Sequence, residues 1–241
     1  MLRIAVLNES TVVSAAAVRA MLPALETQWN RDLRPVWGID RATFVHVPRR
    51  RAPRRGAWWL VFLDDSDQAH DLAYHDLTDE GLPIAKVFVR TILADRASVS
   101  VGASHELCEM AVDPWINSAY QDPAGTFWAG EVCDPVEDDS YGYRIGATLV
   151  SDFVTPDWFA HARARASVDF KRRGSRAFEV LPGGYAQRYD AKRGWVQVNG
   201  SKAKKSRRAA APPGSRRERR ARGEPGHWKV SAPAWSAARR R

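Results

Sequence analysis

The chain has 241 residues, of which 44% are hydrophobic and 27% charged, enough for one fairly large domain or two small ones. Its formal net charge is +9, but residues 201–241 hold 14 Lys or Arg and two acidic residues, a net of +12, which leaves residues 1–200 at −3. Two cysteines are too few for a disulfide framework, and no apolar run approaches the roughly 18 residues of a membrane span. The N-terminus is too short and too soon acidic for a signal peptide, so we expect cytoplasmic synthesis without export.

The first part of the chain alternates between short apolar runs and one long amphipathic stretch. Leu2–Leu7 is an apolar run closed by polar residues, which favours a buried strand. Apolar residues recur at steps of three and four through Val13–Leu33, which predicts a helix. Ala42–Val47, which ends before Pro48, is the second predicted strand.

Further strands and a second helix are expected in the middle of the chain. Ala57–Leu63 is the most apolar run and predicts a buried strand, and Ile84–Ile92 predicts another. A helix should follow from about Ser98 to Asp113. The order of strand, helix, three strands and helix indicates an α+β fold, with a mixed sheet backed by helices.

The last third of the chain shows weaker signals. Residues 117–130 contain Pro123, Gly125 and Gly130, which are typical of a loop, whereas Tyr143–Val150 and Phe178–Leu181 are short strand-like pieces. Residues 183–198 predict the last hairpin. We therefore expect one domain over residues 1–199 and a disordered polycationic tail over residues 200–241, which has too few apolar residues to fold alone.

A possible metal-binding motif lies in the second predicted helix, in the sequence SHELCEMAVDP at residues 104–114. His105 and Glu109 are four residues apart and project from the same face of a helix. The pattern is that of the H-E-x-x-H zinc-peptidase helix with the second histidine replaced by a carboxylate, a ligand that zinc also accepts. Glu106 would then act on a metal-bound water as the catalytic base. The alternative is an ordinary solvated helix face, on which such a pattern also occurs by chance.

Two observations favour the metal site over a solvated face. The motif lies in a mostly apolar segment, where a histidine and two glutamates are costly to bury unless they are paired or coordinated. An acidic cluster at residues 131–139 follows and can supply a third ligand. Glu131 is our first choice, Asp134 the second and Cys133 a weaker one. Zinc is the expected ion, although two carboxylate ligands would also suit calcium or manganese.

Other polar residues have more limited roles in this hypothesis. Asp113 lies about 12 Å along the helix from His105, too far to share one ion, and is expected to orient a ligand or to end the helix. Tyr74, His75 and Tyr141 are candidate donors to an oxyanion, and the sequence does not select among them. For His75, a position in a surface loop is an equal alternative.

Several phrases of the sequence occur together in a known pattern. They are WLVFLDD at 59–65, YHDLT at 74–78, GLP and AKVFV at 81–89, the helix at 104–114, EVCDP at 131–135 and VSDFVTP at 150–156. In this order they resemble a group of largely uncharacterised phage and bacterial proteins that look like zincin-type metallopeptidases with an H-E-x-x-E motif. The resemblance covers roughly residues 50–195. It implies a zincin-like fold in which an edge strand, here expected at Ala85–Val89, lies above the active-site cleft and pairs with an extended peptide.

Three functional hypotheses follow from these patterns. The first is a zinc-dependent hydrolase acting on a peptide or protein. The second is a zincin-shaped structural or binding protein, such as a phage particle component, in which the metal only stabilises the fold; the protein would then be virion-associated. The third concerns the tail, whose charge over residues 201–241 favours binding to nucleic acid or another polyanion. No membrane partner is expected.

Overall fold

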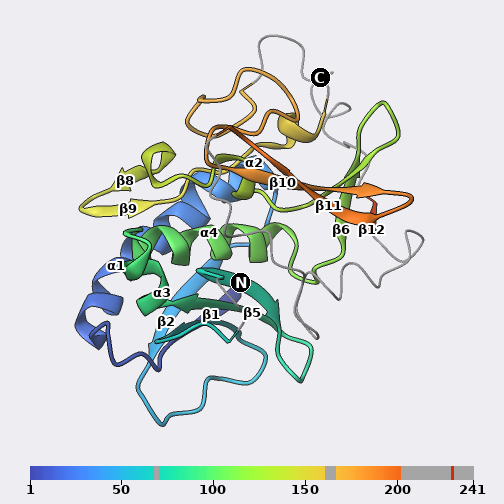
Figure 1. The fold of residues 1–241 in the computed structure, drawn as a ribbon. Helices are drawn as coiled ribbons and strands as arrows, with labels where there is room; N and C mark the ends of the chain where they lie inside the picture. Colours follow the sequence, from blue (N-terminus) through green and yellow to red (C-terminus); the bar gives the residue numbers. More distant parts are fainter. Residues whose placement is uncertain (68–70, 161–166, 202–228, 231–241) are drawn as a thin grey trace.

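The computed structural model describes residues 1–67, 71–160, 167–201 and 229–230, and shows an α+β fold with a mixed five-stranded sheet. None of the helices in these residues combines the length and apolar character needed to cross a membrane. Figure 1 shows one helix across the middle of the molecule, with this sheet on one side and most of the C-terminal half of the described chain on the other.

The first sheet is built from the N-terminal half in the order β2-β1-β3-β5-β4. Its strands are β1 (Leu2–Asn8), β2 (Ala42–Val47), β3 (Trp58–Leu63), β4 (Ala73–Leu77) and β5 (Pro83–Phe88). The first four strands in this order run parallel, which suits apolar runs such as that of β3, and β4 is antiparallel to β5. The connection from β1 to β2 contains α1 (Ala15–Thr27), a π-helical segment (Gln28–Leu33) and α2 (Arg34–Trp37).

The antiparallel edge of the sheet corrects two sequence predictions. The predicted edge strand at Ala85–Val89 is wrong, because β5 lies inside the sheet between β3 and β4. The edge strand is β4, which the sequence did not predict. The strand predicted over Ile84–Ile92 is right as far as Phe88, after which α3 (Val89–Ala94) begins. Gly81, with φ +76°, provides the positive φ in the turn that joins β4 to β5.

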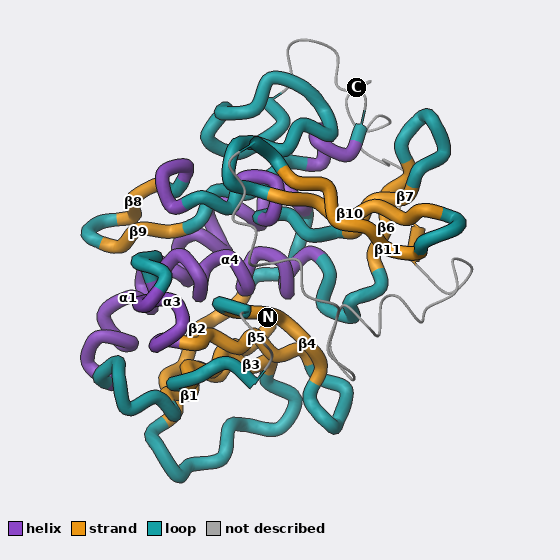
Figure 2. The backbone as a smooth tube through the Cα atoms, in the orientation of Figure 1, coloured by secondary structure: helices purple, strands orange, loops and turns teal. Residues whose placement is uncertain are grey.

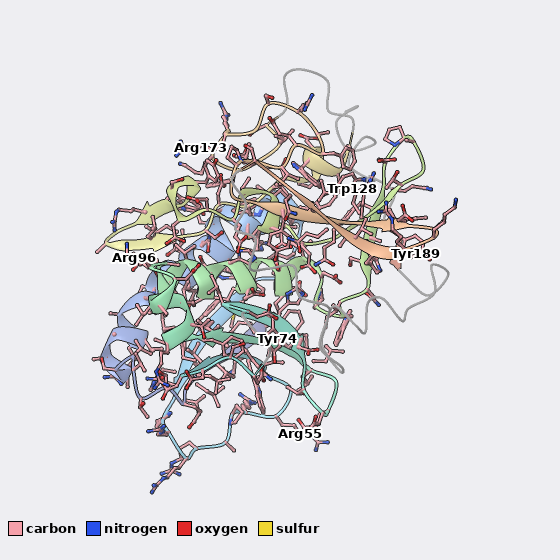
Figure 3. All side chains as sticks on the ribbon, in the orientation of Figure 1. Arg55, Tyr74, Arg96, Trp128, Arg173 and Tyr189 are labelled. Atoms are coloured by element: carbon pink, nitrogen blue, oxygen red, sulfur yellow. The ribbon has the colours of Figure 1, made fainter. Side chains whose placement is uncertain are left out.

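The predicted central helix is confirmed as α4 (Val99–Val112), and it packs on β5 and β4. Figure 2 shows it between the first sheet and a second sheet, whose order is β11-β10-β7-β6-β12. The second sheet contains β6 (Ser118–Gln121), β7 (Phe127–Ala129), β10 (Tyr185–Asp190), β11 (Gly194–Asn199) and β12 (Lys229–Val230). Tyr74 lies with the first sheet and Trp128 with the second, on opposite sides of α4 (Figure 3).

Shorter elements lie between β7 and β10, two strands of the second sheet. They are the 3₁₀ turns Asp134–Val136, Asp139–Tyr141 and Pro156–Phe159, and the hairpin of β8 (Tyr143–Ile145) and β9 (Thr148–Val150). The β8–β9 hairpin and the β10–β11 hairpin agree with the strand and hairpin predicted at these places. The loop predicted over residues 117–130 is wrong in part, because β6 and β7 pair there as a hairpin.

The strand predicted at Phe178–Leu181 is also wrong, since those residues belong to no strand. Phe178 has φ +56° and its ring packs against Trp128 and Trp158. Its apolar character therefore serves packing. Buried apolar residues from both sheets, α1 and α4 form one continuous cluster, which includes Phe62, Leu107 and Phe153.

Most of the predicted tail lies outside the described residues. The exception is β12, whose backbone pairs in parallel with β6. The body of the described chain reaches Ser201, whose carbonyl oxygen accepts a hydrogen bond from the Gly183 amide at 2.8 Å.

Gly184, which lies against the loop at residues 134–135, and Gly102, which lies within α4, differ in how much room they leave for a side chain. A Cβ atom on Gly184 would lie 2.7 Å from the carbonyl oxygen of Asp134 and 2.6 Å from that of Pro135, which are backbone atoms. A Cβ atom on Gly102 would come closest to the flexible end of Ile92, at 2.8 Å.

We expect Gly184→Ala to lower the free energy of unfolding by about 1–3 kcal/mol. Gly102→Ala should change it by less than about 1 kcal/mol, because alanine favours the helix. Urea denaturation of both variants measures the difference, and equal losses would contradict this account.

Candidate metal centre

Helix α4 places His105, Glu106 and Glu109 in the interior of the protein. Their exposed fractions are 7%, 4% and 0%. The solvated helix face considered from the sequence is therefore wrong. A hydrogen bond joins α4 to the segment after β9, because the Ser104 hydroxyl accepts from the Ser151 amide at 2.7 Å. In this orientation of α4, His105 and Glu109 face the loop that follows β7, and Glu106 faces His75 of β4.

The first group of possible ligands is formed by His105, Glu109 and Asp134. His105 Nε2 lies 3.3 Å from Glu109 Oε1 and 3.2 Å from Asp134 Oδ1. Zinc binds nitrogen and carboxylate oxygen at about 2.0–2.2 Å, so two ligand atoms of one tetrahedral ion lie roughly 3.4 Å apart. The three residues could therefore hold a metal ion with little rearrangement.

A second group is formed by His75, Glu109 and Glu131. His75 comes from the edge strand β4 and is completely buried. Its Nδ1 atom lies 3.6 Å from Glu109 Oε2 and 3.4 Å from Glu106 Oε2. The surface-loop alternative for His75 is therefore wrong. Glu109 belongs to both groups, with one oxygen facing each imidazole.

The loop that supplies Glu131 and Asp134 is fixed by backbone hydrogen bonds. The Cys133 amide donates to Glu109 Oε1 at 3.2 Å, so the loop is attached to α4 at a candidate ligand. The carbonyl of Val132 accepts from the Val154 amide at 2.7 Å, and that of Pro135 accepts from the Leu181 amide at 2.9 Å. These hydrogen bonds hold the loop in one conformation, which sets the positions of Glu131 and Asp134.

The ionisation of the cluster is governed by opposing effects. Burial alone would lower the pKa of His105, but the carboxylates of Glu109 and Asp134 outweigh burial and raise it well above its ordinary value. Burial and the Glu131 carboxylate would raise the pKa of Glu109, but the imidazoles of His105 and His75 outweigh them and lower it. The cluster therefore strongly favours positive charge at its centre. A bound divalent cation would supply that charge and would compete with the proton on the imidazole.

The other residues singled out from the sequence take different positions. Asp113 ends α4, where one carboxylate oxygen accepts hydrogen bonds from the amides of Asn117 and Ser118, both at 2.9 Å. The Cys133 thiol interacts with Cys108, and burial followed by this neighbour raises its pKa well above the ordinary value. Tyr141 donates its hydroxyl to the Pro182 carbonyl, and the Tyr74 hydroxyl contacts Asp67. Neither tyrosine is among the residues that line the pocket beside His105.

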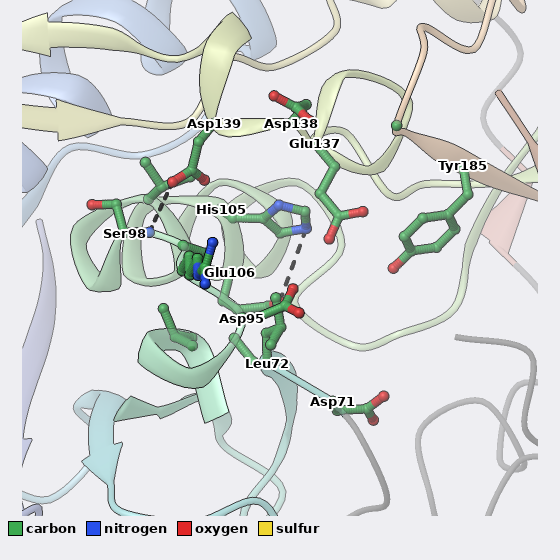
Figure 4. Close-up of a pocket in the computed structure, with 17 residues that line it drawn as sticks. Asp71, Leu72, Asp95, Ser98, His105, Glu106, Glu137, Asp138, Asp139 and Tyr185 are labelled. Atoms are coloured by element: carbon green, nitrogen blue, oxygen red, sulfur yellow. Dashed lines mark hydrogen bonds and ion pairs between the residues drawn. The ribbon is translucent and has the colours of Figure 1, made fainter. Parts of the chain in front are cut away.

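A pocket of about 320 Å³ opens beside the metal-ligand cluster and is lined by His105 and Glu106. In Figure 4 the ring of Tyr185 and the carboxylate of Glu137 extend toward the space in front of His105. The lining also includes Leu72 and Ala73, at the start of the edge strand. The basic residues of the lining are Arg96 and His105. The acidic residues of the lining are Asp71, Asp95, Glu106, Glu137, Asp138 and Asp139.

The sequence identified the acidic segment at 131–139, but it did not show which of its residues lie in the ligand groups and which line the pocket. Glu131 and Asp134 join the ligand groups, whereas Glu137, Asp138 and Asp139 line the pocket. Tyr185 and Asp95 carried no signal, because they are distant in sequence and belong to no motif.

No protein-family model, curated protein or solved structure gives a significant match to this chain. The resemblance described from the sequence thus has no support from these comparisons. What the chain can do chemically rests on the geometry of its own residues.

A second pair of buried carboxyl groups lies outside the candidate ligand groups. Asp152 and Asp169 are both fully buried, and Asp152 Oδ1 accepts a hydrogen bond from the Phe153 amide at 2.8 Å. Burial, followed by the charge of Asp169, raises the pKa of Asp152 to about 8. At neutral pH Asp152 is therefore mostly protonated and can share its proton with Asp169.

Replacing Asp152 should change how stability depends on pH. A carboxyl group with a raised pKa stabilises the folded state at low pH, and this contribution is lost as the pH rises from about 4 through about 8. Asp152→Asn keeps a donor and an acceptor but does not ionise. The free energy of unfolding of the variant relative to wild type should rise between pH 5 and pH 8, as measured by urea denaturation. Asp190→Asn, which removes an exposed carboxylate of lowered pKa, is the control and should show no such rise. Parallel pH profiles for Asp152→Asn and wild type would refute the assignment.

Proposed function

We propose that this chain is a zinc-dependent, metallopeptidase-like hydrolase with a zincin-like fold. The observation that carries the proposal is the position of His105, Glu109 and Asp134 around one point, beside Glu106 and at the wall of a pocket. Asp134 replaces our first choice, Glu131, as the third ligand of this ion, because its carboxylate lies 3.2 Å from His105 Nε2.

Glu106 is the proposed catalytic base. A bound zinc ion would act as a Lewis acid toward the attacking water and the carbonyl oxygen of the substrate. Glu106 would take a proton from that water as its oxygen bonds to the carbonyl carbon, and would pass the proton to the amine as the carbon–nitrogen bond breaks. Its side chain is 6% exposed, and it lines the pocket through which a substrate would arrive.

The edge strand β4 is the proposed binding site for the substrate backbone. It is antiparallel to its neighbour at one end of the sheet order, it carries His75, and Ala73 at its start lines the pocket. An extended peptide can pair with such an edge by main-chain hydrogen bonds. The acidic lining favours peptides that place a positive charge in the pocket.

Glu106→Gln separates an enzyme from a structural metal protein. We expect purified wild type to contain zinc and to cleave members of a fluorogenic peptide library that includes Lys and Arg peptides. The variant should retain zinc but lose turnover by roughly 10²–10⁴-fold, the usual contribution of a general base. Elemental analysis and initial rates are the measurements, with His105→Ala as the variant expected to lose both zinc and activity.

The alternative function is a non-catalytic zincin-like structural or binding protein. In that case wild type and Glu106→Gln would contain equal zinc, and neither would cleave any peptide. If neither wild type nor variant contained metal after reconstitution, the proposed mechanism would be wrong.

The basic tail is the basis of a second proposal, in which it binds nucleic acid or another polyanion and localises the body. Its charge of +12 over residues 201–241 supports counterion release on a phosphate backbone. Because Gly183 both lines the pocket and holds the carbonyl of Ser201, the tail begins at the rim of the pocket.

This second proposal predicts a steep salt dependence. We expect full-length protein to bind a double-stranded DNA oligomer with an affinity that falls sharply as salt is raised. Replacing the nine Lys and Arg of residues 202–220 by Gln should weaken binding and flatten the salt slope, while leaving β12 unchanged. Fluorescence anisotropy measures both effects, with heparin as the comparison polyanion. An unchanged slope would place binding elsewhere.

A further inference from the structure

The structure holds more metal-ligating side chains around α4 than one zinc ion uses. Two histidines and four carboxylates are involved, from β4, from α4 and from the loop after β7: His75, His105, Glu106, Glu109, Glu131 and Asp134. A tetrahedral catalytic zinc ion takes three protein ligands. The proposed mechanism assigns His105, Glu109 and Asp134 to the ion and Glu106 to proton transfer. His75 and Glu131 have no role in it, although both are buried.

We propose that the chain binds a second divalent cation between His75, Glu109 and Glu131, so that Glu109 bridges a dinuclear centre. The inference rests on the first metal position of the proposed function, because the two positions share Glu109. The ligand atoms of each group lie within 4.8 Å of one another, and the groups have only Glu109 in common. They therefore define two neighbouring positions around one carboxylate.

The orientation of Glu109 supports a bridging role. Its Oε1 atom lies 3.3 Å from His105 Nε2, and its Oε2 atom lies 3.6 Å from His75 Nδ1. Both distances are close to the roughly 3.4 Å expected between two ligand atoms of one ion. A carboxylate has two oxygens and can contact a different ion through each. Each position then has one imidazole and one further carboxylate, Asp134 beside His105 and Glu131 beside His75.

Glu106 lies between the two positions. Its Oε1 atom is 3.9 Å from His105 Nε2 and its Oε2 atom is 3.4 Å from His75 Nδ1. This places the proposed base opposite both imidazoles, at the pocket wall. Charge also favours two ions, because a single divalent cation balances only half of the four carboxylates of Glu106, Glu109, Glu131 and Asp134. Mixed imidazole and carboxylate donors suit zinc, manganese or iron.

The test uses the full-length protein, loaded with Mn²⁺ or Zn²⁺ and then freed of loosely held metal by gel filtration. We expect about two ions per chain in wild type by elemental analysis, and about one in Glu131→Gln. Glu137→Gln is the matched control, because it changes a half-buried carboxylate of the same loop region that lies outside both ligand groups. It should retain two ions. Circular dichroism would show that each variant is folded.

The electron paramagnetic resonance spectrum of Mn²⁺-loaded wild type provides a readout that does not depend on any variant. Two Mn²⁺ ions that share a carboxylate are exchange-coupled, so their spectrum should differ from that of isolated ions, and Glu131→Gln should show isolated ions. A wild type that holds one ion with an uncoupled spectrum would overturn the second position and leave the first intact. A wild type that binds no metal would overturn both, which distinguishes failure of this inference from failure of the proposed function.

Discussion

The concentration of buried charge around α4 is the constraint on which the rest of the structure depends. Glu106, Glu109, Glu131 and Asp134 are each less than 5% exposed, and His75 and His105 lie between them. Carboxylates are costly to remove from water unless a proton, a partner or a cation compensates them. The fold must therefore hold six polar side chains close enough to compensate one another, on three segments that are distant in sequence. The shell of backbone contacts around the cluster meets this requirement.

That shell consists of contacts made by neighbouring segments to the back of α4 and to the loop that follows β7. Ser104 connects α4 to Ser151, and the Gln28 side chain donates to the carbonyl of the same Ser151 at 2.8 Å. The π-helical segment that contains Gln28 is thus part of the support for the central helix. On the other side, the amide of Cys133 contacts Glu109 directly. Loop, helix and N-terminal segment are consequently positioned together, and a shift in any one would move a candidate ligand.

The sequence predicted the elements with strong periodicity and missed those shaped by the site. The strands β1, β2 and β3 were predicted from their apolar runs, and the helix α4 from the spacing of His105 and Glu109. Strand β4 was missed because its centre is His75 and Asp76, two polar residues that break the apolar pattern of a buried strand. Both are buried in the structure. The β6–β7 hairpin was mistaken for a loop because Pro123 and Gly125 mark its turn, while its strands have four and three residues. Residues 131–139 were recognised as acidic, but only the conformation of the loop separates ligands from pocket lining.

The position of His75 also connects the metal centre to the sheet edge. His75 of β4 pairs with Ala85 of β5, and its contacts with Glu106 and Glu109 show that its side chain points to the face of the sheet on which α4 packs. The other side of the same strand is the edge of the sheet, where an extended chain can add by main-chain pairing. A ligand on that edge would therefore lie next to the strand that carries a candidate metal ligand. A displacement of β4 by such a ligand would be transmitted to His75 without any intervening loop. This arrangement makes the sheet edge and the buried cluster one structural unit, in which the exposed backbone of β4 and the candidate metal ligands are separated by the width of a single strand.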